Sequence, residues 1–179
     1  RQVRRLLLAP DYEGRPLCLG CDWEKLVELY PNAVEMYWWG EVPAEFHHHP
    51  STRLAPILHD YSQYLHYLSQ EGFDIGLAPL TPTSFNLSKT NTKFRDYGAC
   101  RIPGIYSDVE VYSCCVDHEK TGLLVRNTPG TWFDAMQRLL IDIELREQSD
   151  SSARLVTLST SGAYLARIAF QSTPCMAGS

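Results

Sequence analysis

Short apolar runs alternate with segments of helical spacing along most of this chain. The runs cover residues 33–39, 73–80, 102–107 and 123–125, and each ends at a turn residue or a polar loop. Such runs are typical of buried strands in a parallel sheet, and residues 53–58 favour one further short strand. The pattern therefore predicts an α/β fold with a parallel sheet flanked by helices, in which a ligand lies at the strand ends.

Helical spacing of apolar residues predicts helices between these strands. Asp22 is expected to cap the first helix, which Pro31 and Asn32 end. Asp60 is expected to cap the second helix, and Gly72 to close it. Further helices are predicted at residues 90–100, 131–140 and 145–169.

Composition limits the partners that this chain can have. Its 179 residues and 44% hydrophobic content suit one compact domain with a sizeable core. The net charge of −5 disfavours a nucleic-acid partner, because phosphate backbones are bound through an excess of lysine and arginine. No run of about 18 apolar residues occurs, and residues 1–10 are too weakly apolar for a signal peptide. We therefore expect a soluble, intracellular protein that binds no nucleic acid.

The six cysteines do not follow the pattern of a small secreted disulfide framework. Cys18 and Cys21 form a CxxC motif, which with the histidine triplet 47–49 leaves open half a zinc site or a redox pair. No second CxxC motif follows, and the triplet lies in a proline-flanked loop. Ordinary reduced thiols and a solvated loop are therefore the favoured interpretation.

Candidate chemistry is concentrated in residues 81–96, a hydroxyl-rich loop that leads into a helix. Lys89, Lys93 and Asp96 are separated by four and three residues, which places them on one side of a helix. Amide N–H groups at a helix start, together with two lysines, make a receptor for a diphosphate, and a nearby acid accepts hydrogen bonds from ribose hydroxyls. The alternative is a solvated helix face with an ion pair, and the spacing alone leaves both open.

Several motifs in fixed order carry a family resemblance. The segments FDIGLAPL, FN, DYGA, IPGIYSDV and TGLLV, with the lysines between them and a tryptophan-led helix ending in DIELR, resemble the donor-binding, C-terminal half of family 4 (group 1) GT-B glycosyltransferases. The similarity runs from about residue 30 to residue 146. It implies a Rossmann-like domain over residues 22–171, preceded by a poorly matched segment 1–21 and followed by a tail, 172–179.

The resemblance also implies the site residues. Asp96 stands at the second glutamate of the family's acid pair, which holds the ribose, and Ser88 stands where the first glutamate is expected. Lys93 matches a family lysine that precedes the acid, and the loop that wraps the diphosphate corresponds to Lys89, Thr90, Asn91 and Thr92. A GT-B donor site offsets the leaving diphosphate with helix N-termini and cations, and no DxD pair is present. We therefore expect no metal and no cofactor.

Some features depart from the family. Arg101 and Glu119 stand where relatives carry glycine, and residues 1–21 are expected to lack the glycine-rich first strand and loop. No second Rossmann-like half precedes this one, so we expect a fragment, or one part of a split enzyme, that meets an acceptor-domain protein partner. The resemblance further implies a nucleotide-sugar donor, an acceptor glycan or lipid-linked glycan, polysaccharide biosynthesis, and a cytoplasmic place or a peripheral one at the inner membrane.

Two other functions remain open at this point. The first is a catalytically inactive interaction module that exposes an aromatic face at Tyr37, Trp38 and Trp39, although burial in a core strand explains the same residues. The second is a receiver-like regulatory domain, for which Asp11 and Asp74 would have to form an acidic cluster.

Overall fold

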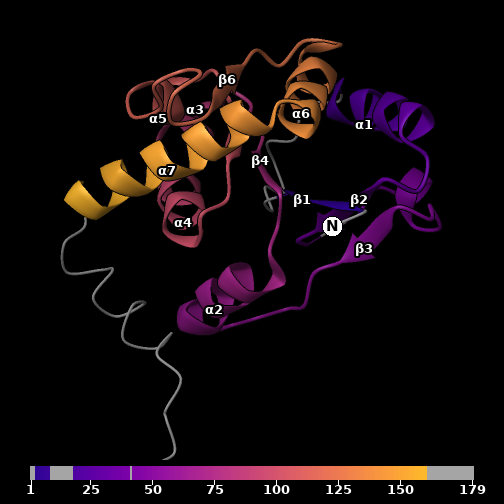
Figure 1. The fold of residues 1–179 in the computed structure, drawn as a ribbon, viewed down its shortest axis with the longest axis horizontal. Coiled ribbons are helices and arrows are strands. Elements are labelled where there is room, and N and C mark those ends of the chain that lie inside the picture. Colours follow the sequence, from indigo (N-terminus) through magenta and orange to yellow (C-terminus); the bar gives the residue numbers. More distant parts are fainter. Residues whose placement is uncertain (1–2, 9–17, 41, 161–179) are drawn as a thin grey trace, which may run out of the picture.

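The chain folds around a six-stranded sheet in which every strand pair is parallel (Figure 1). The computed structural model describes residues 3–8, 18–40 and 42–160. The strand order is β3-β2-β1-β4-β5-β6. The predicted α/β fold with a Rossmann-like parallel sheet is therefore confirmed. The strands are β1 (Arg4–Leu8), β2 (Val34–Trp38), β3 (Thr52–Leu54), β4 (Ile75–Ala78), β5 (Gly104–Ser107) and β6 (Leu123–Val125).

Helices cover both faces of this sheet (Figure 1). Helices α1 and α6 pack together on one face, whereas α2, α4 and α7 lie on the other, with α7 running along α4. No described helix is both long and apolar enough to cross a membrane. The helices are α1 (Cys18–Leu29), α2 (Tyr61–Glu71), α3 (Ser84–Leu87), α4 (Thr92–Cys100), α5 (Glu110–Ser113), α6 (Thr131–Ile141), α7 (Ile143–Thr160) and the 3₁₀ turn η1 (Ala44–Phe46).

The first strand, which we expected to be absent, lies in the middle of the sheet. Leu6 of β1 is in register with Met36 of β2 on one side and with Ile75 of β4 on the other. The strand contains no glycine, and its apolar half, LLL, is fully buried. A parallel central strand needs only a short apolar run, because both of its faces are covered. The family resemblance did not reveal this strand, because its run of three leucines is short and follows three charged residues, Arg1, Arg4 and Arg5.

The pleat of each strand sends alternate side chains to two separate cores. Leu6 and Leu8 enter the core beneath α1 and α6, and Leu7 between them enters the opposite one. The first core is built mainly of leucine, valine and tryptophan, whereas the second holds a group of tyrosines. These tyrosines are Tyr64, Tyr97, Tyr106 and Tyr112, with Tyr37 and Tyr67 packed against them.

Asp22 caps a helix, but not the one predicted. It lies inside α1, fully buried, because the described part of that helix already begins at Cys18. Its carboxylate accepts hydrogen bonds from the backbone N–H groups of Gly130, Trp132 and Phe133, at the start of α6. The residue type was a correct sign of a helix N-terminus, and the helix that it caps lies more than a hundred residues further along the chain.

Most other element boundaries follow the predictions. Asp60 caps α2 by accepting from the Ser62 and Gln63 amides, and Gly72 ends that helix in a left-handed conformation. The strand expected at 53–58 is shorter and begins one residue earlier, at Thr52. The last helix is described to Thr160, so residues 161–169 of the prediction and the tail 172–179 lie outside the described residues.

The two residues that replace family glycines keep the glycine conformation. Arg101, the C-cap of α4, has φ 59°, and Glu119 has φ 66°. Non-glycine residues in this left-handed region carry a steric cost of about 1 to 2 kcal/mol. Both turns therefore keep the shape that glycine would give them, and Arg101 and Glu119 carry the strain in their own backbone.

Candidate functional site

The candidate residues lie at the carboxyl edge of the sheet. Because β4 and α4 run in opposite directions, the N-terminus of α4 lies beside the carboxyl end of β4. Tyr97 fixes this arrangement, since its hydroxyl donates to the Leu77 carbonyl oxygen at 3.0 Å. Its ring covers Gly76, where a Cβ would lie 2.6 Å from the ring. Glycine at position 76 therefore lets α4 approach β4 closely enough to present its first turn.

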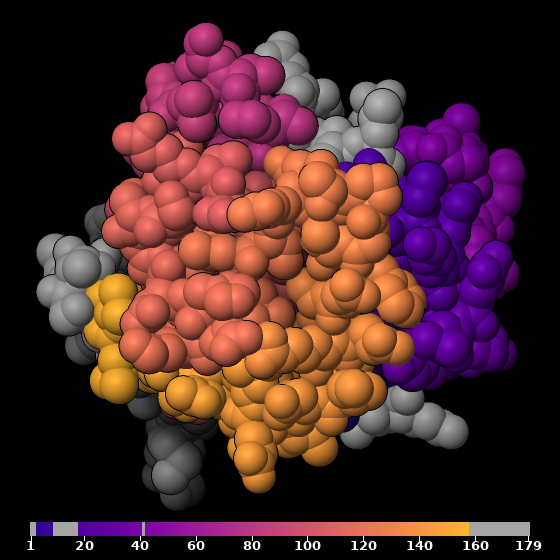
Figure 2. Space-filling model, turned by 90° about the horizontal axis from the view of Figure 1, so that it is seen from above, coloured from indigo at the N-terminus to yellow at the C-terminus, as the bar shows by residue number. Residues whose placement is uncertain are grey.

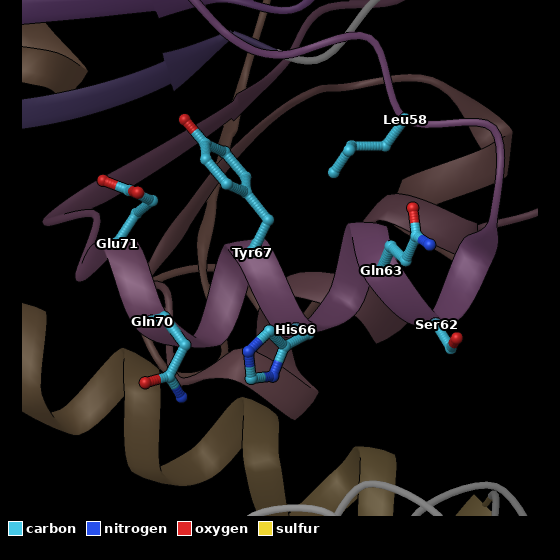
Figure 3. A pocket seen from close by; sticks show the side chains of 7 residues that line it. All are labelled: Leu58, Ser62, Gln63, His66, Tyr67, Gln70 and Glu71. Atoms are coloured by element: carbon cyan, nitrogen blue, oxygen red, sulfur yellow. The ribbon is translucent and has the colours of Figure 1, made fainter.

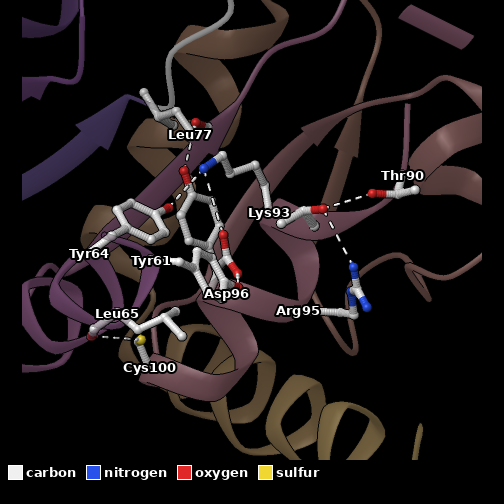
Figure 4. Close-up of polar contacts among 11 residues, drawn as sticks. Tyr61, Tyr64, Leu65, Leu77, Thr90, Lys93, Arg95, Asp96 and Cys100 are labelled. Carbon is white, nitrogen blue, oxygen red and sulfur yellow. Dashed lines mark hydrogen bonds and ion pairs between the residues drawn. The ribbon is translucent and has the colours of Figure 1, made fainter. Parts of the chain in front are cut away.

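Lys93 and Asp96 meet in the first turns of α4, facing α2 (Figure 4). The Lys93 ammonium lies 3.6 Å from Asp96 Oδ2 and donates to the Tyr64 hydroxyl at 2.8 Å, and it also stands 4.6 Å from the centre of the Tyr64 ring. The Tyr61 hydroxyl donates to Asp96 Oδ1 at 2.5 Å. Asp96 is fully buried, and its Oδ2 accepts no hydrogen bond.

Burial dominates the electrostatics of this cluster. It raises the pKa of Asp96 to about 6, although the Lys93 ammonium acts in the opposite direction. Burial, with the neighbouring Asp96 charge, raises the pKa of Tyr64 well above its ordinary value. The same two causes raise the pKa of the Cys100 thiol to about 12, so that thiol stays protonated. The cluster at neutral pH is thus an ammonium and a carboxylate held between phenols.

The other predicted residues lie before α4 and do not join this cluster. Lys89 is not on the helical side that carries Lys93 and Asp96, because α4 begins only at Thr92; its ammonium stands over the Phe85 ring at 4.9 Å. The expected common face of the three charged residues is therefore wrong. Ser88 ends α3, and its hydroxyl donates to the Phe85 carbonyl oxygen.

Thr90 and Asn91 form the entry to α4. The Thr90 hydroxyl lies 2.8 Å from the Thr92 hydroxyl, and Asn91 takes the N-cap position. The Asn91 side chain accepts no hydrogen bond from the first-turn amides. By contrast, carboxylates cap both α2 and α6. The start of α4 therefore directs amides toward the sheet edge without a carboxylate of its own.

A hydrogen-bonded network ties together the loops at the ends of β4, β5 and β6. Ser107 Oγ accepts from the Leu80 amide at 2.7 Å and donates to Asn127 Oδ1 at 2.9 Å. The Asn127 amide group donates to the Leu80 carbonyl oxygen at 2.8 Å, and the Trp132 indole donates to Asn127 Oδ1. These residues were not predicted, because each has a partner far away in the sequence.

Tyr61 and Tyr64 were also missed as site residues. Their spacing on α2 indicated core or rim positions, and they do stack on each other, with ring centroids 5.9 Å apart. Nothing local in the sequence shows that their hydroxyls reach α4. The one available sign was the position of α2 itself, which starts at the carboxyl end of β3 and so at the same edge of the sheet.

Figure 2 shows the segment around α3 projecting as a magenta lobe beyond α5 and α6.

A separate open pocket of about 530 Å³ lies against the outer side of α2 (Figure 3). It contains none of the predicted site residues. Its lining consists of Leu58, Ser62, Gln63, His66, Tyr67, Gln70 and Glu71.

Two alternatives from the sequence lose the residues on which they were based. Trp38 is buried, and Tyr37 and Trp39 are half-buried against rings of the α2 side, so they form no exposed aromatic face. Asp74 precedes β4, at the amino end of the sheet, and pairs with Arg4 at 2.9 Å, whereas the other half of the expected receiver cluster, residue 11, lies outside the described residues.

The CxxC motif lies in the first turn of α1, where Cys18 is half-buried and Cys21 exposed. Burial raises the pKa of the Cys18 thiol, and the Asp22 charge adds to the rise. The His47 ring contacts the Val42 carbonyl oxygen, and the His49 ring accepts from the Ser51 amide. Within the described parts of the chain, no three histidine, cysteine or acidic side chains gather as metal ligands.

The fold of this chain is similar to that of solved glycosyltransferase structures. The fold superimposes on WaaG, a glycosyltransferase involved in lipopolysaccharide biosynthesis, with a TM-score of 0.67 and 14% identity over 94% of this chain. It matches the C-terminal domain of the group 1 glycosyltransferase LpcC from Francisella tularensis with a TM-score of 0.63 and 11% identity, covering 89% of this chain and 86% of that domain. Anabaena HepE, solved with UDP and glucose, gives a TM-score of 0.65 and 11% identity over 95% of this chain.

This is the fold of a GT-B glycosyltransferase C-terminal domain. The fold expected from the family resemblance is thereby confirmed. The chain spans about half the length of the larger enzymes, covering 46% of WaaG and 48% of HepE. No protein-family model matches the sequence, and no curated protein matches it.

Proposed function

We propose that this GT-B half binds the nucleotide-diphosphate sugar of a glycosyl transfer reaction, with Asp96 as the ribose acceptor. The observation that carries the proposal is Asp96 Oδ2, a buried carboxylate oxygen that accepts no hydrogen bond at the carboxyl edge of the sheet. Buried polar atoms that lack a hydrogen bond are rare and costly, and an ion pair at 3.6 Å does not replace that bond, so such an atom is a sign of function. A ribose hydroxyl would supply the missing donor.

The diphosphate would lie at the start of α4. First-turn amides carry partial positive charge, and the N-cap residue Asn91 leaves them without a side-chain acceptor. Lys93 adds a full positive charge, which a hydrogen bond to the Tyr64 hydroxyl and a cation–π contact with the Tyr64 ring hold in place. The loop residues Ser88, Lys89 and Thr90 would close over the same anion from the α3 side.

In the reaction, the acceptor hydroxyl attacks the anomeric carbon while the bond to the diphosphate oxygen breaks. Negative charge then grows on the departing nucleoside diphosphate, and the Lys93 ammonium and the α4 amides would offset it. A preorganised donor of this kind changes rates by ~10² to 10³. We expect these groups to do this without a metal ion.

The rest of the enzyme is proposed from the likeness to larger glycosyltransferases. We expect an acceptor-binding domain or protein partner to face this half, with a glycan or lipid-linked glycan as acceptor. WaaG acts in lipopolysaccharide biosynthesis and HepE was solved with UDP and glucose, which supports a role in polysaccharide biosynthesis. The corresponding place is the cytoplasm or the periphery of the inner membrane.

Calorimetric titration with UDP-, GDP- and ADP-sugars tests the proposal. Lys93→Ala should weaken donor binding at least tenfold, whereas Arg126→Ala removes the same charge after a different strand and should leave binding unchanged. Because Lys93→Ala leaves Asp96 buried without its cation, Lys93→Gln serves as a second variant, and thermal unfolding confirms that each variant is folded. Equal losses at positions 93 and 126 would remove Lys93 from the site, and no binding of any donor would contradict the proposal.

A second candidate function is an inactive interaction module. The specific observation in its favour is a set of exposed apolar side chains at the same sheet edge, of which Leu54 is 71%, Ile57 84% and Phe85 61% exposed. These replace the aromatic residues that the sequence suggested for such a face. Tight binding of an acceptor-domain protein together with no nucleotide binding would favour the module over the donor half.

A further inference from the structure

Asp96 can accept a pair of ribose hydroxyls only if a side chain of the chain itself moves. Its exposed fraction is 0%, and the Tyr61 hydroxyl donates to Oδ1 from the side of α2 (Figure 4). The two carboxylate oxygens are therefore unequal: Tyr61 occupies one, and the other accepts no hydrogen bond. A pair of neighbouring sugar hydroxyls needs both.

We propose that the Tyr61 hydroxyl holds the place of one ribose hydroxyl on Asp96, and that a ribose diol must displace it, which makes Tyr61 a determinant of affinity and of discrimination between ribose and 2′-deoxyribose. This inference rests on the proposed donor site and adds the regulation of that site. The phenol O–H and a ribose O–H are the same kind of donor, so they compete for one acceptor and do not bind together.

The local structure permits this displacement. Tyr61 is the first residue of α2, directly after the Asp60 cap, and its side chain is 42% exposed. The hydrogen bond from Lys93 ends on Tyr64, one turn further along α2. The cation therefore keeps its tyrosine partner when the Tyr61 ring turns outward, and the carboxylate exchanges one hydroxyl donor for another.

The competition predicts an unusual dependence on the sugar. A ribonucleotide presents two hydroxyls, so it must remove Tyr61 from Oδ1. Its apparent affinity is therefore its intrinsic affinity multiplied by the fraction of protein molecules in which Tyr61 has left Asp96. A 2′-deoxyribonucleotide presents one hydroxyl, which Oδ2 of Asp96, an atom that accepts no hydrogen bond, can accept while Tyr61 stays on Oδ1. Removing the Tyr61 hydroxyl should therefore raise the affinity for the ribonucleotide and leave the affinity for the 2′-deoxyribonucleotide unchanged.

The experiment compares wild-type protein with Tyr61→Phe by calorimetric titration. The probes are UDP, GDP and ADP, each beside its 2′-deoxy counterpart. For the nucleotide that binds, Tyr61→Phe should tighten the ribose form by ~10-fold, since breaking a hydrogen bond to a charged group costs that much or more. The 2′-deoxy form should change by no more than about twofold. Binding that appears only in Tyr61→Phe would support the same conclusion.

Tyr30→Phe is the matched control. Its hydroxyl accepts from Gln137 on the opposite side of the sheet, so its removal should change neither titration. Tyr61→Leu repeats the test should the phenylalanine variant fold poorly, as judged by thermal unfolding. An unchanged or weaker ribonucleotide affinity in Tyr61→Phe, or an equal gain for both sugars, would overturn this inference and leave the donor site intact. No nucleotide binding in any variant would overturn both.

Discussion

Among the residues that the structure describes, each face of the sheet fully buries one carboxylate, and the two carboxylates differ in their hydrogen bonds. On the α1/α6 face, Asp22 accepts backbone hydrogen bonds with both oxygens, and the surrounding core is aliphatic and tryptophan-rich. On the α2/α4 face, Asp96 lies among tyrosines, and its Oδ2 accepts no hydrogen bond and faces the Lys93 ammonium at 3.6 Å. Burial alone therefore does not identify a functional acid. Asp22, whose oxygens are both satisfied, holds the fold together, whereas Asp96 at the strand ends is the acid for which we propose a ligand.

Removing the Asp22 carboxylate should have the largest effect on stability. Asp22→Ala leaves buried N–H groups at the start of α6 without an acceptor, and each costs about 1 to 3 kcal/mol. We expect the unfolding free energy to fall by about 4 kcal/mol, measured by urea denaturation. Donor binding to the protein that remains folded should be unchanged. A loss of binding without a loss of stability would reverse the roles assigned to the two faces.

Asp96 should make stability depend on pH. Its folded-state pKa of about 6 lies above the ordinary value of 3.8, so between these values the folded protein holds a proton that the unfolded chain has released. The stabilisation is complete below pH 4 and is lost as pH rises through 6. Relative to Asp96→Asn, the unfolding free energy should fall by about 3 kcal/mol across that window. A constant difference from pH 4 to 8 would contradict the buried state of Asp96.

The same protonation should act on the ligand in the opposite sense. The charged carboxylate is the better acceptor, and the groups that face it are Lys93, Tyr61, Tyr64 and Arg95. Affinity for a nucleotide-diphosphate sugar should therefore rise several-fold from pH 5 to pH 7.5 in the wild type and stay flat in Asp96→Asn. Nucleotide sugars suit this measurement because their esterified phosphates do not titrate in that range.

Gly76 lies under the Tyr97 ring, on the face of the sheet that we expect to be the more tightly packed. In Gly76→Ala, the new Cβ would meet the Tyr97 ring at 2.6 Å and push α4 away from β4. We expect a loss of about 2 kcal/mol by thermal or urea unfolding, together with weaker donor binding. Gly20→Ala on α1 is the control, because its Cβ would lie 3.5 Å from Phe46, an ordinary contact. Similar losses in both variants would show that the tyrosine face is no more tightly packed.

The smallest expected effect is a gain. Arg101 ends α4 with φ 59°, a conformation that glycine adopts without strain. Arg101→Gly should raise the unfolding free energy by about 1 kcal/mol in denaturant titration. Glu119→Gly is a poorer test, since it also removes the ion pair with Arg138. A lower stability in Arg101→Gly would show that the arginine side chain offsets its backbone strain.

Local signals were sufficient for most of the fold. The alternation of short apolar runs with helical spacing predicted the parallel sheet, and Asp60 and Gly72 marked both ends of α2, because caps and turns depend on neighbouring residues. The first strand was missed since its only signal is a run of three leucines, and its central place arises from two partners that come later in the chain.

The candidate site was predictable only in part. Lys93 and Asp96 do meet, because their spacing of three residues falls within one helix. Lys89 does not join them, since helical spacing has no meaning before the helix begins at Thr92. The contacts from Tyr61 and Tyr64 depend on how α2 packs against α4, and a single sequence contains no local pattern that reports this packing.

The hydrogen bonds between Asp22 and the start of α6 also constrain the order in which the chain can fold. During translation, Asp22 leaves the ribosome long before residues 130–133, so its carboxylate stays hydrated until the sixth helix has been synthesised. The aliphatic layer can close only late, whereas α2 and β4 can form earlier. Force measurements on stalled nascent chains should therefore show a late folding step, which Asp22→Ala would weaken.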